Sequence, residues 1–269
     1  MTDKGAAMSL YLAMIGKSYR KHLAYRSEVW VRIVIGVVWV AIQVAVWRAL
    51  IGSGEVDGIT LPDMITYAIL NTVTALAMMD RSLAELDQKI RSGDIAVDLI
   101  KPFHYPLTLV ADGLGRSLFA ALFSVLPTLG LAALFFGFQA PASTRNGLAF
   151  ALAFVIALAI SFALACLVGM LGFYFLATFH FQWALGALRT LFAGTMVPLW
   201  FYPDDLRTLA NVLPFQFLAF FPAATWMGEL SGSEIAGNLT LGLAWSVALL
   251  GLCWWLWSRM VRRLVVQGG

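Results

Sequence analysis

Few groups of residues in this sequence could carry catalytic or binding chemistry, and each of them is incomplete. Gly16-Lys17-Ser18 ends like a phosphate-binding P-loop, in which the lysine reaches the phosphates and the hydroxyl binds Mg²⁺. The first glycine of that motif would fall at position 11, which is Tyr11. The tripeptide also lies in a segment with helical patterning rather than after a strand, so the sequence predicts no nucleotide site here.

The stretch Asp112-Gly113-Leu114-Gly115-Arg116 is similar to the start of a membrane phosphotransferase signature. That signature continues with further aspartates at helical spacing, whereas this chain continues into an apolar run. Residues four apart on a helix share a face, and opposite charges there attract. We therefore expect Asp112 and Arg116 to pair near the lipid headgroups, and we expect no catalysis.

The histidines and cysteines also give no sign of a metal site or a nucleophile. His22, His104 and His180 are far apart, and the sequence contains neither HExxH nor GxSxG. Cys166 and Cys253 both lie in apolar runs, where a buried thiol behaves as a small hydrophobic group. The sequence thus predicts no catalytic residue, no metal and no cofactor on this chain.

The composition predicts what kind of structure holds these residues. The chain is 61% hydrophobic and 12% charged, whereas soluble domains average about 45–50% apolar and about 25% charged residues. No soluble fold can bury so much apolar surface, so the solvent must be lipid. The apolar runs are long and unbroken rather than alternating, which argues against a barrel. We predict an all-α integral membrane protein with a single domain over residues 1–269.

Six segments reach the roughly 20 apolar residues that a transmembrane helix needs. The predicted spans are Val29–Ile51, Leu61–Met79, Ala111–Phe138, Gly147–Thr178, Trp183–Trp200 and Ile235–Trp257. The centres of the third, fourth and sixth spans carry no ionisable residue, unlike most ion-coupled carriers.

Polar and small residues mark two of these spans. The mid-membrane polar groups of the second span, which we take as a candidate substrate path, are Asn71, Thr72 and Thr74. In the fifth span, small residues at four-residue steps favour close helix packing, either within the chain or in a dimer: Gly186, Thr190 and Gly194.

Basic residues predict the orientation. Most Lys and Arg lie near the termini or between the second and third spans, whereas Arg48, Arg145 and Arg207 lie on the other side among most of the acids. The positive-inside rule then puts both termini in the cytoplasm, in a multi-pass protein of the cell's inner (plasma) membrane.

Two further segments are predicted to lie at the membrane surface. In residues 8–26 the apolar residues recur at helical spacing, and the basic residues fall largely on the other side of the helix. This pattern favours an interfacial helix with its cations against anionic headgroups. In residues 204–230, a helix can begin after Pro203, and Pro214 and Pro222 divide the rest into pieces too short to cross the bilayer. We expect short half-helices that dip into the outer leaflet.

The longest charged stretch lies between the second and third spans. Leu83, Leu86 and Ile90 form a narrow apolar stripe at helical spacing, and Gly93 suits a C-terminal cap. The sequence predicts a short cytoplasmic helix over residues 81–92 that rests on the membrane domain and offers its charges to water or a partner.

Three motifs in this order resemble a known family. They are LAYR at residues 23–26 before the first span, RSGDIAVDLIKPFHYP at 91–106, and MVPLWFYPDDLRTLANVLPF at 196–215 followed by FFPAATWMGE. Together they resemble the permease subunits of ABC-2 type exporters, particularly the small six-span permeases with a separately encoded ATPase.

The resemblance implies how the chain works. Residues 81–92 would be a coupling helix in a groove of the ATPase, with the contact made by Leu83, Glu85, Leu86, Lys89 and Arg91. ATP and Mg would bind the partner ATPase, and a second permease copy, identical or related, would complete the path. An apolar interior favours lipophilic or amphiphilic cargo, and nothing suggests a nucleic-acid partner. The alternatives are a secondary carrier or channel without an ATPase, or a membrane-embedded lipid-modifying enzyme.

Overall fold

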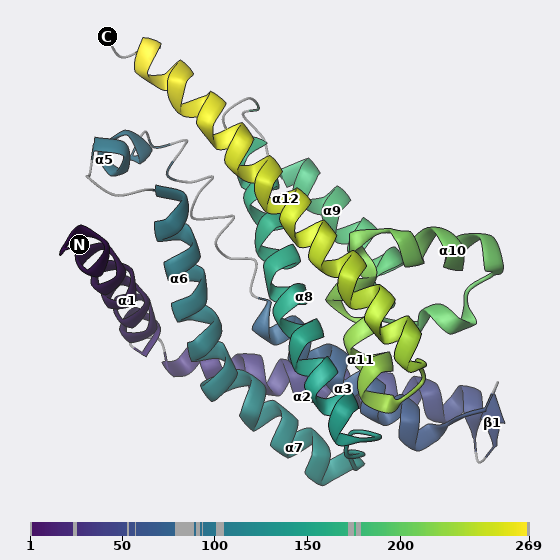
Figure 1. The fold of residues 1–269 in the computed structure, drawn as a ribbon. Helices are drawn as coiled ribbons and strands as arrows, with labels where there is room; N and C mark the ends of the chain where they lie inside the picture. The colour runs from purple at the N-terminus through teal and green to yellow at the C-terminus, as the bar shows by residue number, and fades with distance from the viewer. Residues whose placement is uncertain are drawn as a thin grey trace.

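The computed structural model describes residues 2–23, 26–52, 54–56, 58–78, 89, 92, 94–100, 105–171, 175 and 179–267 (Figure 1). The regular secondary structure of the described residues is helical apart from one short antiparallel hairpin of β1 (Glu55–Val56) and β2 (Ile59–Thr60). The prediction of an all-α fold is confirmed. Its α-helices are α1 (Thr2–Leu23), α2 (Arg26–Ile51), α3 (Leu61–Ala77), α5 (Ile95–Ile100), α6 (Tyr105–Ala120), α7 (Leu126–Phe136), α8 (Thr144–Leu171), α9 (Phe179–Phe192), α10 (Asp204–Val212), α11 (Phe220–Met227) and α12 (Gly232–Gln267).

A π-helical turn, η1 (Ala121–Val125), joins α6 and α7 into one continuous helical run. Pro127 follows this turn, and its ring has no N–H and would clash with the carbonyl of the preceding turn of a regular helix. The wider π turn accommodates that clash. The run therefore stays continuous from Tyr105 to Phe136 and is long enough to cross a membrane.

α3 is the central helix of the first half of the chain. Its residues from Met64 to Thr74 are all buried, because α2, α7 and α11 pack around it. Its N-terminus begins with a capping box in which Thr60 is the N-cap residue, and Asp63 Oδ2 accepts a hydrogen bond from the Thr60 N–H at 2.9 Å. α2 and α7 approach closely at Gly36, where an added Cβ would lie 2.9 Å from Thr128 Cγ2.

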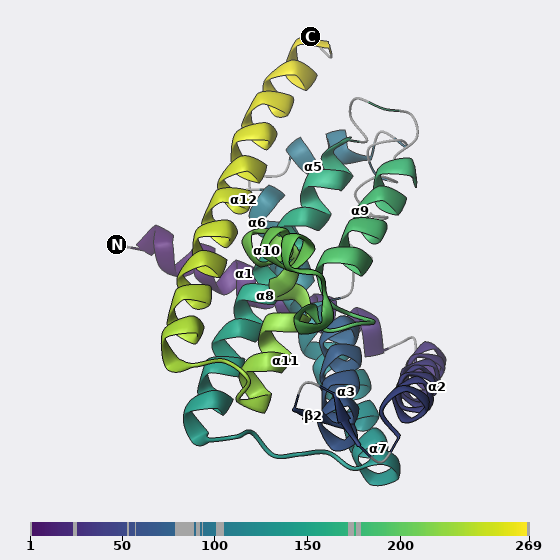
Figure 2. The ribbon, with the colours of Figure 1, turned by 90° about the vertical axis from the view of Figure 1, so that its right-hand side faces the viewer.

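The second half is built on α8 and α12, which pack side by side (Figures 1 and 2). Gly242 allows this approach, because an added Cβ there would lie 2.8 Å from Ile156 Cγ2. Between α9 and α12 the chain forms η2 (Leu199–Phe201), α10, η3 (Pro214–Leu218) and α11. Figure 2 shows α2, α3 and α7 gathered on one side of the molecule and α12 on the other.

The two halves meet where α3 contacts α11 and the bend after α9. The Tyr67 hydroxyl donates a hydrogen bond to the Gly194 carbonyl at 2.5 Å, and Gln43 Nε2 donates to the Thr195 carbonyl at 3.1 Å. Both bonds end on the same bend, so the first half is joined to the second through the backbone carbonyls of Gly194 and Thr195.

Among the described residues, four helical segments are long and apolar enough to cross a membrane: Glu28–Ile51, Tyr105–Phe136, Thr144–Leu171 and Gly232–Met260. They correspond to the first, third, fourth and sixth predicted spans. The second predicted span is α3, which at 17 residues is about 26 Å long, slightly less than the roughly 30 Å of bilayer hydrocarbon.

The prediction of one helix over Trp183–Trp200 is wrong at its C-terminal end. α9 ends at Phe192, and the chain turns at Gly194, whose φ of +71° lies in the left-handed region. Gly194 therefore lies outside the helix that holds Gly186 and Thr190, and the three residues do not form one helical face. Pro222 also does not break its segment, because it lies in the first turn of α11, where its missing N–H removes no helical hydrogen bond.

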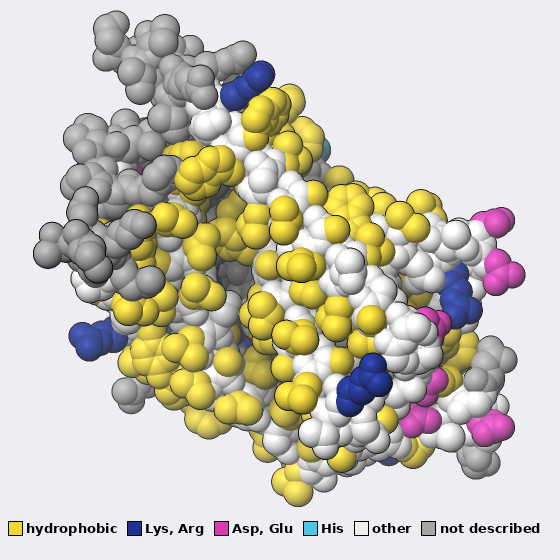
Figure 3. All heavy atoms as spheres, viewed as in Figure 1, with side chains coloured by type: hydrophobic (Ala, Val, Ile, Leu, Met, Phe, Trp, Pro, Cys, Tyr) yellow, Lys and Arg dark blue, Asp and Glu magenta, His cyan; other side chains and the backbone are white. Residues whose placement is uncertain are grey.

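The face drawn in Figure 3 is largely apolar, and most of its charged side chains lie toward the edges. Acidic side chains gather on the side where α10 and β1 lie, whereas both chain termini lie toward the opposite side. Exposed acids of this acidic end are Glu55, Asp204, Asp205, Glu229 and Glu234. The pKa of Glu229 is raised by partial burial and, secondarily, by the nearby Asp63 carboxylate.

Candidate functional site

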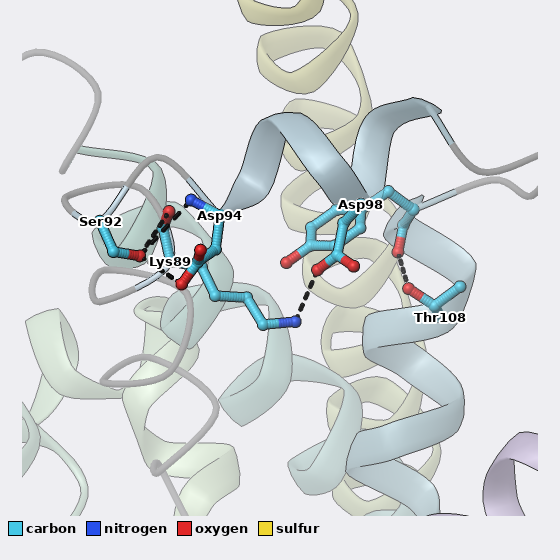
Figure 4. A network of polar contacts seen from close by, with 6 residues as sticks. Lys89, Ser92, Asp94, Asp98 and Thr108 are labelled. Atoms are coloured by element: carbon cyan, nitrogen blue, oxygen red, sulfur yellow. Dashed lines mark hydrogen bonds and ion pairs between the residues drawn. The ribbon is translucent and has the colours of Figure 1, made fainter.

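The segment that follows the predicted coupling helix is held by polar contacts (Figure 4). Lys89 Nζ lies 2.7 Å from Asp98 Oδ2 on α5, and Ser92 Oγ donates a hydrogen bond to Asp94 Oδ2 at 2.7 Å. The Lys89 side chain keeps 43% of its surface exposed. Of the predicted contact residues, Lys89 lies at this anchored end, and the others lie outside the described residues: Leu83, Glu85, Leu86 and Arg91.

Ile95 anchors α5. Ile95 is 3% exposed and belongs to a hydrophobic cluster whose other members come from the start of α6, the end of α8 and the C-terminal half of α12: Tyr105, Met170, Trp257 and Met260. The Tyr105 and Trp257 rings stack with centroids 5.0 Å apart, and Lys89 Nζ lies 5.8 Å from the Tyr105 ring centroid. A displacement of α5 would therefore change the packing at the ends of α6, α8 and α12. We name this group the Ile95 cluster.

The Ile95 cluster was not predicted from the sequence. A signal was present in KPFHYP, where an aromatic residue followed by a proline begins α6. Proline favours the first turn of a helix, so it fixes where α6 starts, and an aromatic at that position lies at the end of a span, where tyrosine and tryptophan are common. The partner ring, Trp257, is more than a hundred residues away in sequence, and no local pattern connects the two.

The predicted Asp112–Arg116 pair is confirmed. Arg116 Nη2 lies 2.8 Å from Asp112 Oδ2, and the Arg116 side chain is only 2% exposed. α1 covers the pair. Ser18 Oγ donates a hydrogen bond to the Asp112 carbonyl at 2.9 Å. The α1 backbone comes so close to Gly115 that a Cβ added at Gly115 would lie 2.5 Å from the Ile15 carbonyl oxygen. The predicted amphipathic segment is thus helical up to Leu23 and is docked on α6.

The polar residues proposed for a substrate path lie inside the helix bundle. Asn71, Thr72 and Thr74 are 6%, 6% and 2% exposed. Thr72 Oγ1 donates to the Ala68 carbonyl at 2.9 Å, whereas neither polar atom of the Asn71 amide has a hydrogen-bond partner among the described residues. The amide lies beside the buried Tyr67 hydroxyl, which comes four residues earlier on α3.

The small residues of α9 lie on an exposed face. Thr190 Oγ1 donates to the Gly186 carbonyl at 3.0 Å, and both residues line an open hollow of about 780 Å³ with Trp183 and Val197. Gly194 instead accepts the Tyr67 hydrogen bond at the junction of the two halves. Gly186 and Thr190 are therefore available to another helix, and Gly194 is used within the chain.

No group of three or more His, Cys, Asp and Glu side chains that could hold a metal occurs in the described part of the chain. The geometry suits a mechanical role, because the short helix α5 is packed against the ends of three long apolar helices. A model of the family described as ABC-2 family transporter protein matches residues 33–268.

The chain belongs to the ABC-2 transporter family.

The match begins within α2 and includes the Ile95 cluster and the segment before it. A search of the curated proteins found no match. As a membrane component of an ABC-2 transporter, the chain is an integral membrane protein of a typically non-catalytic type, and the family implies an ABC ATPase as its partner.

Proposed function

We propose that this ABC-2 chain is the permease subunit of an ATP-driven exporter whose ATPase is a separate chain. The observation that carries the proposal is the Ile95 cluster, which ties the segment after residues 81–92 to α6, α8 and α12. A docking helix needs such a contact with the membrane helices, because motion of a partner ATPase can drive transport only if it changes how those helices pack.

In this proposal α3 and α9 complete a set of six spans with the four long apolar segments. Both termini and residues 81–92 face the cytoplasm. The acidic end, with α10 and α11 as outward half-helices, faces outside, as the positive-inside rule favours.

Two copies of this permease, or this chain and a related one, would enclose the transport path. The central contact would lie near α2, α3 and α9, and the exposed Gly186 and Thr190 face of α9 suits close packing against another helix. Small residues there let two backbones approach.

The proposed mechanism needs no nucleotide on this chain. ATP and Mg bound by the partner close the two ATPase subunits and move residues 81–92. The Lys89–Asp98 ion pair and Ile95 pass that motion to the spans, which alternate between inward-facing and outward-facing packing. ATP drives this change only through the partner's different affinities for the two states.

The cargo in this proposal is lipophilic or amphiphilic, because the interior offers few polar groups and no buried carboxylate in the second span. Asn71, Thr72 and Thr74 are the candidate path residues, and the Asn71 amide is the one that could bond a polar group of the cargo. An uncharged amide suits hydrogen-bonding groups rather than ions.

Co-purification with the ATPase tests the docking role. Glu85→Arg and Leu86→Asp should each reduce the ATPase recovered with the permease, while the permease still inserts in the membrane. Leu118→Asn is a matched control, since Leu118 is 50% exposed on α6 and lies outside the docking segment. Unchanged recovery with both docking variants would refute this assignment.

A further inference from the structure

Ser124 and Thr128 are two buried hydroxyl residues within and just after the π turn η1. Both residues are 0% exposed, and neither hydroxyl oxygen has a hydrogen-bond partner among the described residues. On α3, by contrast, the buried Thr72 hydroxyl donates a hydrogen bond to the carbonyl four residues earlier, that of Ala68, at 2.9 Å. Pro127 explains why the turn is π-helical, but it does not explain why two polar groups there lack a partner.

The winding of η1 accounts for the missing bonds. The Leu126 N–H donates a hydrogen bond to the Ala121 carbonyl, which is five residues earlier instead of the four of a regular helix. Serine and threonine hydroxyls inside a regular helix commonly donate to the carbonyl four residues earlier, and this bond often accompanies a bend in the helix. A different bend at η1 can therefore give both hydroxyls a bond that the present winding withholds.

α7, the helix after η1, is fixed in the first half of the chain. Ala132 of α7 is 0% exposed and packs in one hydrophobic cluster with α2 residues such as Val40 and α3 residues such as Ile69. Thr128 lies so close to α2 that a Cβ added at Gly36 would be 2.9 Å from Thr128 Cγ2. A displacement of α7 would thus disturb the centre of the first half.

α6, the helix before η1, has other neighbours. It packs mainly along α1, and its first residue, Tyr105, belongs to the Ile95 cluster (Figure 1). Two cavities of about 340 Å³ and 200 Å³ lie between the middle of α6 and the pair formed by α8 and α12, so packing is loose on this side. The continuous run from Tyr105 to Phe136 therefore joins two differently packed regions, and η1 is the junction.

We propose that η1 is a hinge between α6 and α7 that carries motion of α5 into the membrane helices. In the bend described here the Ser124 and Thr128 hydroxyls have no partner, and in a second bend they donate to carbonyls of the preceding turn. The inference rests on the proposed function, because the ATPase supplies the motion of α5. The 16 residues of α6 make a lever of about 24 Å, so a swing of about 10° moves its start by about 4 Å.

Distances between spin labels test the hinge. The permease, with its two cysteines replaced by alanine, is placed in nanodiscs with its ATPase, and double electron–electron resonance is recorded without nucleotide and after trapping with ATP and vanadate. Leu107→Cys on α6 and Val34→Cys on α2 give the test pair, and their distance should shift by several Å. Leu134→Cys on α7 and Val38→Cys on α2 give the control pair, whose distance should stay the same. All four positions are exposed.

Removal of the two hydroxyls tests their role in the hinge. The double variant Ser124→Ala/Thr128→Val loses two buried groups that have no partner in the present bend, so the permease alone should gain roughly 2–4 °C in Tm. It should also lower the fraction of shifted test pairs in the trapped complex several-fold. Ser246→Ala is the matched control, because the buried Ser246 hydroxyl donates to the Gly242 carbonyl at 2.9 Å, and its loss should not raise the Tm.

The outcomes separate the hinge from the proposed function, because ATPase binding and ATP hydrolysis are measured on the same samples. If the complex hydrolyses ATP but neither pair shifts, or if both pairs shift equally, the hinge is overturned while the ATPase partnership stands. If no ATPase binds, the proposed function fails, and the Tm of the permease alone still decides. A double variant with an unchanged or lower Tm would overturn the role of the two hydroxyls and with it the hinge.

Discussion

The contact between α1 and α6 gives a prediction whose size follows from the structure. An added Cβ at Gly115 would lie 2.5 Å from the Ile15 carbonyl oxygen and 2.7 Å from Ser18 Cβ. Both neighbours belong to the α1 helix, and the first is backbone, so no side-chain rotation relieves the clash. Gly115→Ala must move α1 away from α6, which breaks the packing over the Asp112–Arg116 pair.

Overpacking of this kind typically costs about 1–3 kcal/mol. For a chain of this size each kcal/mol lowers the Tm by roughly 2–4 °C, so Gly115→Ala should lower the Tm in detergent by roughly 2–12 °C. The change should also increase amide hydrogen exchange in α1, because α1 is then no longer packed closely against α6. Thermal unfolding followed by tryptophan fluorescence measures the first effect, and exchange mass spectrometry measures the second.

Gly113→Ala is the matched control. It lies two residues away on the same helix, but its added Cβ would meet Phe162 ring carbons at 3.5 Å, an ordinary van der Waals distance. Alanine also has the better helix propensity, so this change should leave the Tm equal or slightly higher. If Gly115→Ala were as stable as wild type, or if both variants lost the same stability, α1 would not be docked as described.

Three further predictions concern other parts of the molecule. Ile95→Ala removes the side chain that anchors α5, so it should lower transport per ATP hydrolysed while the ATPase still co-purifies; a normal ratio of transport to hydrolysis would contradict the coupling role. Tyr67→Phe leaves the Gly194 carbonyl without its donor in a buried site, which should cost about 1–3 kcal/mol and lower the Tm, and an unchanged Tm would contradict the role of this bond in joining the halves. Glu229 has a raised pKa in the folded protein, so its carboxyl favours folding when protonated and loses this contribution as pH rises from about 4.3 through the raised value. The Tm of Glu229→Gln should therefore increase relative to the Tm of wild type as the pH rises over this range. A Tm of the variant that increased relative to wild type as the pH fell would contradict the sign.

Local patterns were enough to predict the long helices and one ion pair. Unbroken apolar runs have no alternative to a helix in lipid, which is why the four long spans were found. The Asp112–Arg116 pair followed from a spacing of four residues on one helix. Both depend only on residues close together in sequence.

Features that depend on distant residues could not be predicted in this way. Gly194 fits a four-residue pattern with Gly186 and Thr190, but its left-handed φ and its bond to Tyr67, 127 residues away, take it out of the helix. Arg116 was expected near the headgroups, and nothing near it in sequence says that α1 covers it. The Ile95 cluster likewise brings α5 and the start of α6 against α8 and α12, which are distant from them in sequence.

The central claim is that ATP hydrolysis on a partner moves this chain's membrane helices through residues 81–92. Its most direct test is flux of an amphiphilic fluorescent cargo in proteoliposomes that contain the permease with its ATPase, the permease alone, or the Leu86→Asp permease with the ATPase. Flux is predicted only in the first case and only with ATP and Mg. Flux by the permease alone, without ATP, would contradict the account and indicate a carrier or channel.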